Sequence, residues 1–434
     1  MRKIYLLLLT VCFAAMANGQ VTVNVTNPTN TTPNLAASYT SLALALTDLN
    51  AVTAMTGPVT LTCVTGSETA PSAAGFTIGS ATLNPVLSAT NTVTINTSGG
   101  AVTLNAAAGG TGLPNSAVQD GILKIVGADY ITIDGLTLVD GNAANPATME
   151  FGIGLFKLSL SDGAQNNTIQ NCSITLNRIN NASSTAPAVE GSRGINVVNS
   201  TDVAQTTPLT PTTAAGTNSN NMFYANTIEN CNYGIVLNGF AATTPFTAGD
   251  TGNDIGGLAP ATGNTILNYG GAAAATNPAA GIRANNQWSI NISYNTINNN
   301  NGSGVNHVTT LRGIYAQAGT SANATINNNT VTISSAATTS AATAIENVIG
   351  STAASNTVNI NNNLIQNCTY STATTGTFTG ILNGASAANV NMNGNTVNNC
   401  SVGTSGTASV GIFQGIYSSG TATNLSISNN TVTN

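Results

Sequence analysis

The chain has 434 residues, of which 41% are hydrophobic, only 5% are charged and 5% are aromatic, and its formal net charge is −6. The apolar content is too high for a chain kept disordered by its charge, and there is no Gly-X-Y period or Lys/Glu/Leu-rich pattern, which excludes collagen and coiled coils. Eight Lys and Arg residues against 14 Asp and Glu residues provide no basic stripe for phosphates, so no nucleic-acid partner is expected.

Residues 1–19 have the pattern of a secretory signal peptide. Arg2 and Lys3 precede an apolar run over residues 4–15, and the small residues Ala17 and Gly19 predict cleavage before Gln20. A lipoprotein anchor at Cys12 is the less favoured alternative, because the bulky Val11 precedes it. No later run is long and apolar enough for a transmembrane helix, so we expect a protein that is secreted or at the bacterial cell surface.

The segment 38–50 is the only helical-looking stretch after the leader. We expect Leu42, Leu44, Leu46 and Leu49 to cover the open end of the following structure, because an uncovered strand edge invites pairing with other chains. Residues 57–64 would form the first strand beneath this cap.

Two short phrases recur along the rest of the chain and define a repeat. Successive Asn residues of Asn-Thr-Ile/Val phrases are 31 to 38 residues apart, except for one gap of 59 that contains a Thr- and Pro-rich stretch, predicted to be an inserted surface loop over residues 204–221. The phrase begins at Asn167, Asn226, Asn264, Asn295, Asn329, Asn395 and Asn430, with a variant at Asn363. A Gly-Ile phrase alternates with it at Gly194, Gly234, Gly281, Gly313, Gly380 and Gly415, and Ala344-Ile345 fills the remaining gap.

Short stretches of period-two alternation between turn residues, at a repeat near 34 residues, predict an all-β, right-handed parallel β-helix with about three strands per coil. The repeated Asn is then explained in two ways. Asn tolerates the positive φ of a sharp bend, and stacked Asn side chains can hydrogen-bond from coil to coil.

Four cysteines occupy one local frame in this pattern, namely Cys172, Cys231, Cys368 and Cys400. We interpret them as small apolar side chains that stack in one column inside the core. Disulfides between stacked neighbours are the second interpretation. Metal binding is the third, because His307 is the only histidine.

The phrases at residues 128–138 (Ala-Asp-Tyr-Ile-Thr-Ile-Asp-Gly-Leu-Thr-Leu), 166–172 (Asn-Asn-Thr-Ile-Gln-Asn-Cys) and 255–257 with 263–266 resemble the secreted right-handed parallel β-helix (pectate-lyase-like) repeat proteins of Bacteroidetes. The resemblance covers roughly residues 36–434 and implies a coil, not a reaction. Many such proteins are adhesin-like and carry a C-terminal domain for type IX secretion. The sequence ends within a repeat at Asn434, so we expect a C-terminal truncation. The predicted domains are a signal peptide (1–19), an N-terminal segment with a cap helix (20–56) and the β-helix (57–434).

No catalytic, cofactor-binding or metal-binding residues are assigned from the sequence, and no cofactor is expected. Asp250–Asp254 has the density of a Ca²⁺ loop but occurs once, which favours a turn. Asp129 and Asp134 are expected on one strand with opposite orientations, and His307 in a loop. Trp288 is expected to plug the core or a loop base, with sugar stacking as the alternative.

The basic residues beyond the leader are widely spaced in the sequence: Lys124, Lys157, Arg178, Arg193, Arg283 and Arg312. Arg283 follows a Gly-Ile phrase and Arg312 precedes one, so strict alternation predicts that they face different sides and form no cluster.

The favoured function is a non-catalytic, adhesin-like structural protein whose partners are glycans or other cell-surface components. The alternative is a carbohydrate-active enzyme, a polysaccharide lyase or glycoside hydrolase, with its site near residues 204–221 and 250–254. Such an enzyme requires acidic and basic groups that converge on one face.

Overall fold

The computed structural model describes residues 20–108, 119–141, 151–178, 191–271, 278–301, 307–351, 355–403 and 411–433. The predicted signal peptide over residues 1–19, including Cys12, and the C-terminal Asn434 lie outside the described residues. Among the described residues, no helix has the length and hydropathy needed to cross a membrane.

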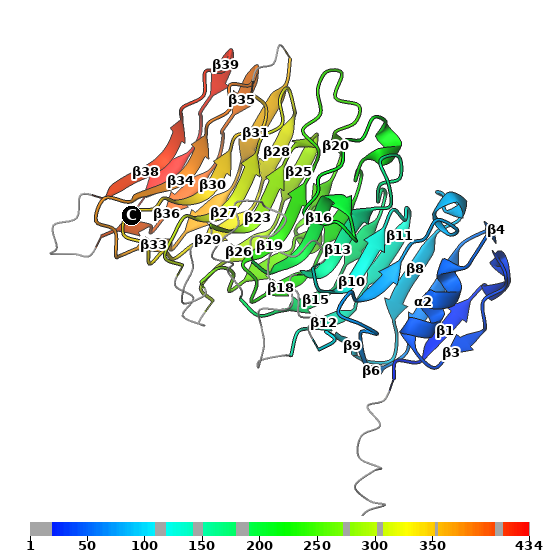
Figure 1. Cartoon of the computed structure of the whole chain (residues 1–434). Helices are drawn as coiled ribbons and strands as arrows, with labels where there is room; N and C mark the ends of the chain where they lie inside the picture. The colour runs from blue at the N-terminus through cyan, green and yellow to red at the C-terminus, as the bar shows by residue number, and fades with distance from the viewer. Residues whose placement is uncertain are drawn as a thin grey trace, which may run out of the picture.

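The described chain winds into a parallel β-helix whose coils stack along one axis, which confirms the predicted fold class (Figure 1). Successive coils contribute one strand each to three long sheets. The 13-stranded sheet contains, in spatial order, β3 (Ser38–Tyr39), β1 (Val23–Thr26), β5 (Val59–Cys63), β8 (Val93–Thr97), β11 (Ile131–Asp134), β14 (Thr168–Gln170), β17 (Met222–Tyr224), β21 (Asp254–Ile255), β25 (Ile290–Ser293), β28 (Ala324–Asn327), β31 (Thr357–Asn361), β35 (Asn389–Asn391) and β39 (Asn424–Ser426).

The other two long sheets follow the same order of coils. The ten-stranded sheet contains β7 (Phe76–Ile78), β10 (Gly121–Val126), β13 (Phe151–Lys157), β16 (Arg193–Thr201), β19 (Tyr233–Asn238), β23 (Ala279–Asn285), β27 (Leu311–Gln317), β30 (Ala342–Asn347), β34 (Thr377–Asn383) and β38 (Ile412–Ser418). The 11-stranded sheet contains β6 (Gly66–Thr69), β9 (Val102–Asn105), β12 (Thr137–Val139), β15 (Ser173–Thr175), β18 (Thr227–Glu229), β22 (Thr265–Leu267), β26 (Thr296–Asn298), β29 (Thr330–Thr332), β32 (Leu364–Gln366), β36 (Thr396–Asn398) and β40 (Thr431–Thr433).

Three two-stranded pairs and a few helices complete the described structure. The pairs are β2 (Thr31–Thr32) with β4 (Ala54–Met55), β20 (Asp250–Thr251) with β24 (Gln287–Trp288), and β33 (Thr369–Tyr370) with β37 (Ser401–Val402). The helices are α2 (Leu42–Asn50) and the 3₁₀ turns η1 (Pro28–Asn30), η2 (Asn84–Val86), η5 (Ala214–Gly216) and η6 (Pro260–Thr262).

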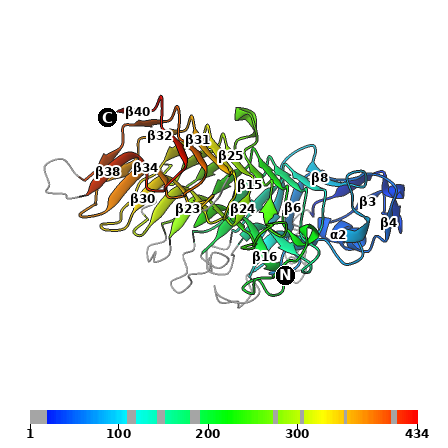
Figure 2. The ribbon, with the colours of Figure 1, turned by 90° about the horizontal axis from the view of Figure 1, so that it is seen from above.

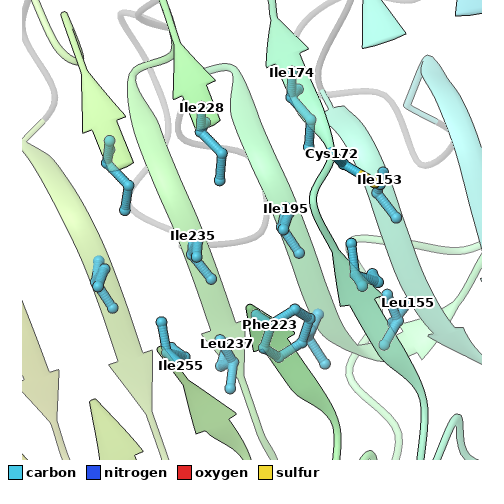
Figure 3. Packing of buried hydrophobic residues seen from close by; sticks show 14 of the residues in the cluster. Ile153, Leu155, Cys172, Ile174, Ile195, Phe223, Ile228, Ile235, Leu237 and Ile255 are labelled. Carbon is cyan, nitrogen blue, oxygen red and sulfur yellow. The ribbon is translucent and has the colours of Figure 1, made fainter. Parts of the chain in front are cut away.

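The interior of the tube is filled by columns of aliphatic side chains. The Ile residues of the Gly-Ile phrases pair in register from strand to strand of the ten-stranded sheet, as Ile195 does with Ile235 and Ile235 with Ile282. Figure 3 shows Ile195 and Ile235 side by side, with Ile174 and Ile228 repeating the arrangement on the 11-stranded sheet. Burial of these columns provides the main driving force for stacking the coils.

Asn residues form the bends between sheets, as the composition predicts. Most of the non-Gly residues with positive φ in the described chain are Asn; Asn328 has φ 58° and Asn362 has φ 55°. Each of these two residues directly precedes an Asn that is buried. One Asn therefore provides the left-handed bend, and the next directs its side chain into the tube.

The buried Asn residues form a continuous hydrogen-bonded ladder at the corner that leads into the 11-stranded sheet. In each step the Nδ2 group of one Asn donates to the Oδ1 atom of the Asn in the next coil, at 2.9 to 3.1 Å. The ladder contains Asn226, Asn264, Asn295, Asn329, Asn363, Asn395 and Asn430. The expected coil-to-coil bonding is thus confirmed.

Asn167 does not belong to this ladder, although its phrase reads the same. It precedes β14 of the 13-stranded sheet and bonds to Asn221 in a separate, shorter ladder. The gap of 59 residues in the sequence therefore runs from Asn167 at one corner of the coil to Asn226 at a different corner. The true spacing across the inserted loop is 54 residues, from Asn167 to Asn221 and from Cys172 to Asn226.

The same shift corrects the prediction of a single cysteine column. The backbone N–H of Cys172 donates to Oδ1 of Asn226, so Cys172 occupies the position of the Asn ladder one coil earlier. Cys231, Cys368 and Cys400 all lie three residues after in-register positions of the 11-stranded sheet, at a different corner. These four cysteines and Cys63 are buried and free, which agrees with the interpretation as small core side chains.

The N-terminal segment covers the first coils, opposite the end formed by β38 and β40 (Figure 2). Helix α2 begins after Ser41, whose hydroxyl accepts from the N–H of Leu44, and the carboxylate of Glu68 accepts from the N–H groups of Leu42 and Ala43. Leu42, Ala45, Leu46 and Leu49 are buried. The expectation for Leu44 was wrong: its side chain is 53% exposed, because it lies on the solvent side of the helix.

Candidate functional site

The ten-stranded sheet gathers basic residues that are far apart in the sequence. Lys124 lies on β10, Arg193 on β16, Arg283 on β23 and Arg312 on β27, while Lys157, at the end of β13, is fully buried. Stacking of coils therefore converts a wide sequence spacing into proximity on one sheet.

Two arginines and two tyrosines make up what we call the arginine–tyrosine surface: Tyr233, Arg283, Arg312 and Tyr315. Arg312 and Tyr315 are half-buried, whereas Tyr233 and Arg283 are buried beneath them, at 1% and 7% exposed. The guanidinium carbon of Arg312 lies 3.9 Å from the ring centroid of Tyr315. That of Arg283 lies 5.8 Å from the ring centroids of both Tyr233 and Tyr315. These distances are typical of cation–π contacts, which hold the planar guanidinium groups in place.

The prediction that Arg283 and Arg312 face different sides was therefore wrong, and the cause is the Gly of the Gly-Ile phrase. On β27 the residues that point into the core are Leu311, Ile314 and Ala316, so the alternation skips one residue at Gly313. A Cβ atom at Gly313 would lie 2.4 Å from Val331 Cγ1 and 2.5 Å from the carbonyl oxygen of Ala344. Only Gly fits this close approach, and the skip turns Arg312 to the same side as Tyr315.

Two carboxylates near this face are paired with different cations. Glu346 accepts from Nε of Arg312. Asp202 lies 2.6 Å from Nζ of Lys124. Within the described part of the chain, these contacts do not bring two carboxylates together as the acid and base of a glycosidase would require.

A cleft of about 370 Å³ opens at the edge of the same sheet, between the inserted loop and the chain that follows β19. We call it the loop cleft. It is lined by Val198, Asn199, Gln205, Thr206, Pro208, Leu209, Thr210, Asn238, Gly239, Phe240, Ala241 and Asn286. The predicted loop insertion over residues 204–221 therefore forms one wall of a pocket.

Two buried amide side chains of the loop cleft have oxygen atoms with no hydrogen-bond partner among the described residues. Asn199 is 5% exposed and donates from Nδ2 to the carbonyl of Leu209, while its Oδ1 is unpaired. Gln205 is 3% exposed and donates to the carbonyl of Asp202, while its Oε1 is unpaired. Buried acceptors of this kind usually have a partner, but both oxygens are screened from solvent, so a donor in the cleft would reach them only after the surrounding side chains shift.

The loop cleft and the arginine–tyrosine surface are joined by a row of amides. Asn238, at the cleft, accepts from Nδ2 of Asn285 at 2.8 Å. Asn285 pairs in register with Gln317, whose Oε1 accepts from Nη2 of Arg283 at 2.8 Å. The polar and aromatic groups therefore form one continuous strip across β19, β23 and β27.

The acidic stretch 250–254 is structural in this fold, although part of it forms short strands rather than the expected turn. Asp250 is fully buried and lies 3.8 Å from Nζ of the equally buried Lys157. Burial raises the pKa of Asp250 and lowers the pKa of Lys157, in each case against the pull of its partner. Asp254 accepts from the hydroxyl of Tyr224 and from the side-chain amide of Asn291.

Asp129 does not lie on the strand that contains Asp134, which corrects the prediction. Strand β11 begins at Ile131, and Asp129 lies in the preceding bend, where it accepts from the N–H of Gln165. Burial, together with the nearby charge of Asp162 from the next coil, raises the pKa of Asp129 to about 7. The pairing of Asp129 with Asp162 was not found from the sequence, because the two residues belong to different coils.

His307 and Trp288 are both buried. The Nδ1 atom of His307 accepts from the N–H of Gly271, and its Nε2 atom lies 2.9 Å from Thr309 Oγ1. Trp288 stacks on Phe246 with ring centroids 5.7 Å apart and donates to the carbonyl of Thr320. Trp288 therefore plugs a loop base, as expected, and is not presented for sugar stacking.

Comparison with known proteins gives distant structural matches. No protein-family model matches the chain, and no curated protein sequence is significantly similar to it. The crystal structure of PfbA, a surface adhesin of Streptococcus pneumoniae, aligns with 88% of this chain and 88% of its own at 10% identity and a TM-score of 0.41. The A-module of the mannuronan C-5 epimerase AlgE6 of Azotobacter vinelandii aligns with 86% of this chain and 90% of its own, at 12% identity and a TM-score of 0.28.

Proposed function

We propose that this chain is a secreted or cell-surface, adhesin-like β-helix protein that binds glycans, without catalysis, on the outer face of its ten-stranded sheet. The observation that carries the proposal is the loop cleft, which is lined by amide side chains and apolar residues and adjoins the row of amides on β19, β23 and β27. The leader-like residues 1–19 and the resemblance to secreted β-helix repeat proteins support export, and type IX secretion is part of that proposal.

The chemistry of the loop cleft favours a ligand rich in hydroxyl groups. Amide oxygens accept hydrogen bonds, and sugar hydroxyls donate them. Phe240, Pro208 and Leu209 line the same cleft, so an apolar wall faces the polar atoms. Sites that combine an apolar wall with a few placed polar groups are typical of small-molecule recognition.

Arg312 and Tyr315, the half-buried members of the arginine–tyrosine surface, extend the site along the stack. The row from Asn238 through Asn285 to Gln317 crosses three successive strands of the sheet. Strands of one sheet are about 4.8 Å apart, so a linear chain of several sugar units would contact more than one coil. Several weak contacts along one chain would together give useful affinity.

Binding to a panel of immobilised glycans tests the proposal. The variant Gln205→Met removes the unpaired acceptor while keeping the length of the side chain, and we expect at least tenfold weaker binding. Val203→Ser is the matched control, because Val203 lies in the same loop, is 68% exposed and does not line the cleft. Equal binding by the wild type and Gln205→Met would contradict the proposed site.

The enzyme alternative is tested on the same glycans. We expect no new reducing ends and no unsaturated products when the protein is incubated with any glycan that it binds. Accumulation of either product would overturn the non-catalytic proposal.

A further inference from the structure

Two of the five described cysteines lie directly above one another in consecutive coils. Gln366 pairs in register with Asn398 on one side, and Thr369 pairs with Ser401 on the other. Cys368 and Cys400 therefore occupy equivalent positions between two registered pairs. Neighbouring strands are separated by about 4.8 Å, which falls within the range of Cα–Cα distances that a disulfide spans.

The two thiols also influence each other's ionisation. The neighbouring Cys368 thiol is the largest influence on the pKa of the Cys400 thiol and lowers it to about 7, against the effect of burial. Burial and the neighbouring Cys400 raise the pKa of Cys368. Cys400 is thus the thiol that ionises first, and Cys368 keeps its proton at neutral pH.

Cys400 lies beside a cleft. It lines a cleft of about 420 Å³ together with Val402, Gly411, Phe413 and Val432. Its own side chain is nearly buried, so a reagent must enter this cleft to reach the sulfur atom.

We propose that Cys368 and Cys400 are a disulfide-forming site that links two consecutive coils when the protein meets a small-molecule disulfide. The Cys400 thiolate attacks one sulfur of the disulfide RSSR, forms a mixed disulfide and releases RS⁻. Cys368 gives up its proton, attacks the Cys400 sulfur and expels the second RS⁻. Two cysteine thiols are oxidised, RSSR is reduced, and the two released thiolates take up the two protons as RSH.

The other described cysteines are not placed for this reaction. Cys63 pairs in register with Thr97, Cys172 stacks on Asn226, and Cys231 lies above the position of Tyr269. Burial raises the pKa of Cys63 and of Cys172 to about 12. The proposal therefore predicts a single cross-link of defined identity.

In the test, the folded, reduced protein is treated with oxidised glutathione, and the remaining thiols are then blocked. The protein is digested without reductant, and the peptides are analysed by mass spectrometry. We expect one cross-linked pair of peptides that contain Cys368 and Cys400, and two fewer free thiols per chain. The cross-link should raise the melting temperature, and a reductant should reverse the rise.

Two variants make the outcome specific. Cys400→Ser should abolish the cross-link and leave Cys368 reduced, whereas Cys231→Ser, a matched change at the same type of corner, should leave the cross-link intact. Circular dichroism verifies that both variants are folded. Thiols that stay reduced in the folded wild type while the unfolded chain reacts, a mixed disulfide on Cys400 that never resolves, or a cross-link through another cysteine would each overturn the proposal.

Discussion

The side-chain amide of Asn295 donates to Oδ1 of Asn329 in the next coil at 3.0 Å and to the backbone carbonyl of Ile255 at 3.0 Å. The Oδ1 atom of Asn295 in turn accepts from the backbone and the side chain of Asn264. One buried side chain thus joins its own coil to the coils on either side, and the ladder fixes the register of the stack while leaving few polar atoms unpaired.

Asn295→Ala should therefore destabilise the protein strongly. The substitution leaves the donors of Asn264 and the carbonyl of Ile255 without this partner and removes one of the two hydrogen bonds to Oδ1 of Asn329, and such losses cost about 3–5 kcal/mol in total. Urea denaturation followed by circular dichroism measures the change. In Asn391→Ala, a half-buried side chain loses one bond to Asn359, and a cost below about 1 kcal/mol is expected. Similar costs for the two variants would show that the ladder is not a special source of stability.

Asp129 should make stability depend on pH. Its pKa is about 7 in the folded protein against an ordinary value of 3.8, so the folded state holds the proton more tightly than the unfolded state. The sign follows directly: stability from this group is fully present below about pH 4 and is lost as the pH rises through about 7. Asp129→Asn keeps the acceptor for Gln165 and removes the charge.

We expect Asp129→Asn to match the wild type near pH 4 and to exceed it at pH 8 by about 1–2 kcal/mol, a figure reduced for screening by solvent. Denaturation midpoints at the two pH values provide the measurement. Asp134→Asn removes the same charge from the neighbouring strand, where Gln170 and Asn171 donate to the carboxylate, and should give no such gain. A flat difference between Asp129→Asn and the wild type across this range would argue against a pKa of Asp129 that is raised by burial.

The buried pair of Lys157 and Asp250 should respond differently to single and double substitution. Lys157→Met leaves a fully buried carboxylate without its cation, which costs about 3–5 kcal/mol. Lys157→Met combined with Asp250→Asn removes both charges and should recover most of that loss, as measured by thermal denaturation near neutral pH. A double variant that is as unstable as the single variant would mean that the pair contributes packing, not charge compensation.

Gly313→Ala tests the local cause of the arginine–tyrosine surface. The added Cβ would press on Val331 and on the carbonyl of Ala344, and overpacking of this kind costs about 1–3 kcal/mol. At Gly384 the nearest atom would lie 3.7 Å away, so Gly384→Ala is the matched control and should be nearly neutral. The melting temperatures of Gly313→Ala and Gly384→Ala, each compared with that of the wild type, provide the measurement. Equal tolerance at both positions would mean that the skipped alternation does not depend on Gly.

Much of the fold could be predicted because equivalent positions in successive coils have the same types of residue. The Gly-Ile phrase, replaced in one coil by Ala344-Ile345, marks one sheet throughout, since Ile fills the core and a small residue allows a close approach at that place. The Asn-Thr-Ile phrase is ambiguous, because the corners before the 13-stranded and the 11-stranded sheets both require a buried Asn that hydrogen-bonds to the next coil. Asn167 and Asn226 therefore read alike, and Cys172 was assigned to the wrong column.

The candidate site was less predictable. Period-two alternation put Arg283 and Arg312 on opposite sides, and only the skip at Gly313 brings both to Tyr315. The unpaired oxygens of Asn199 and Gln205 depend on how the inserted loop folds back, and that path has no repeat to reveal it. A sequence signal was present only in the insertion itself, which interrupted the period.

Hydrogen–deuterium exchange of the full chain, with and without a saturating glycan selected from the panel, tests the binding site most directly. The account predicts slower exchange in the described segments that line the loop cleft and the arginine–tyrosine surface, at residues 198–210, 238–241, 283–286 and 312–317. Unchanged exchange there, or slowing confined to the 13-stranded sheet, would contradict it.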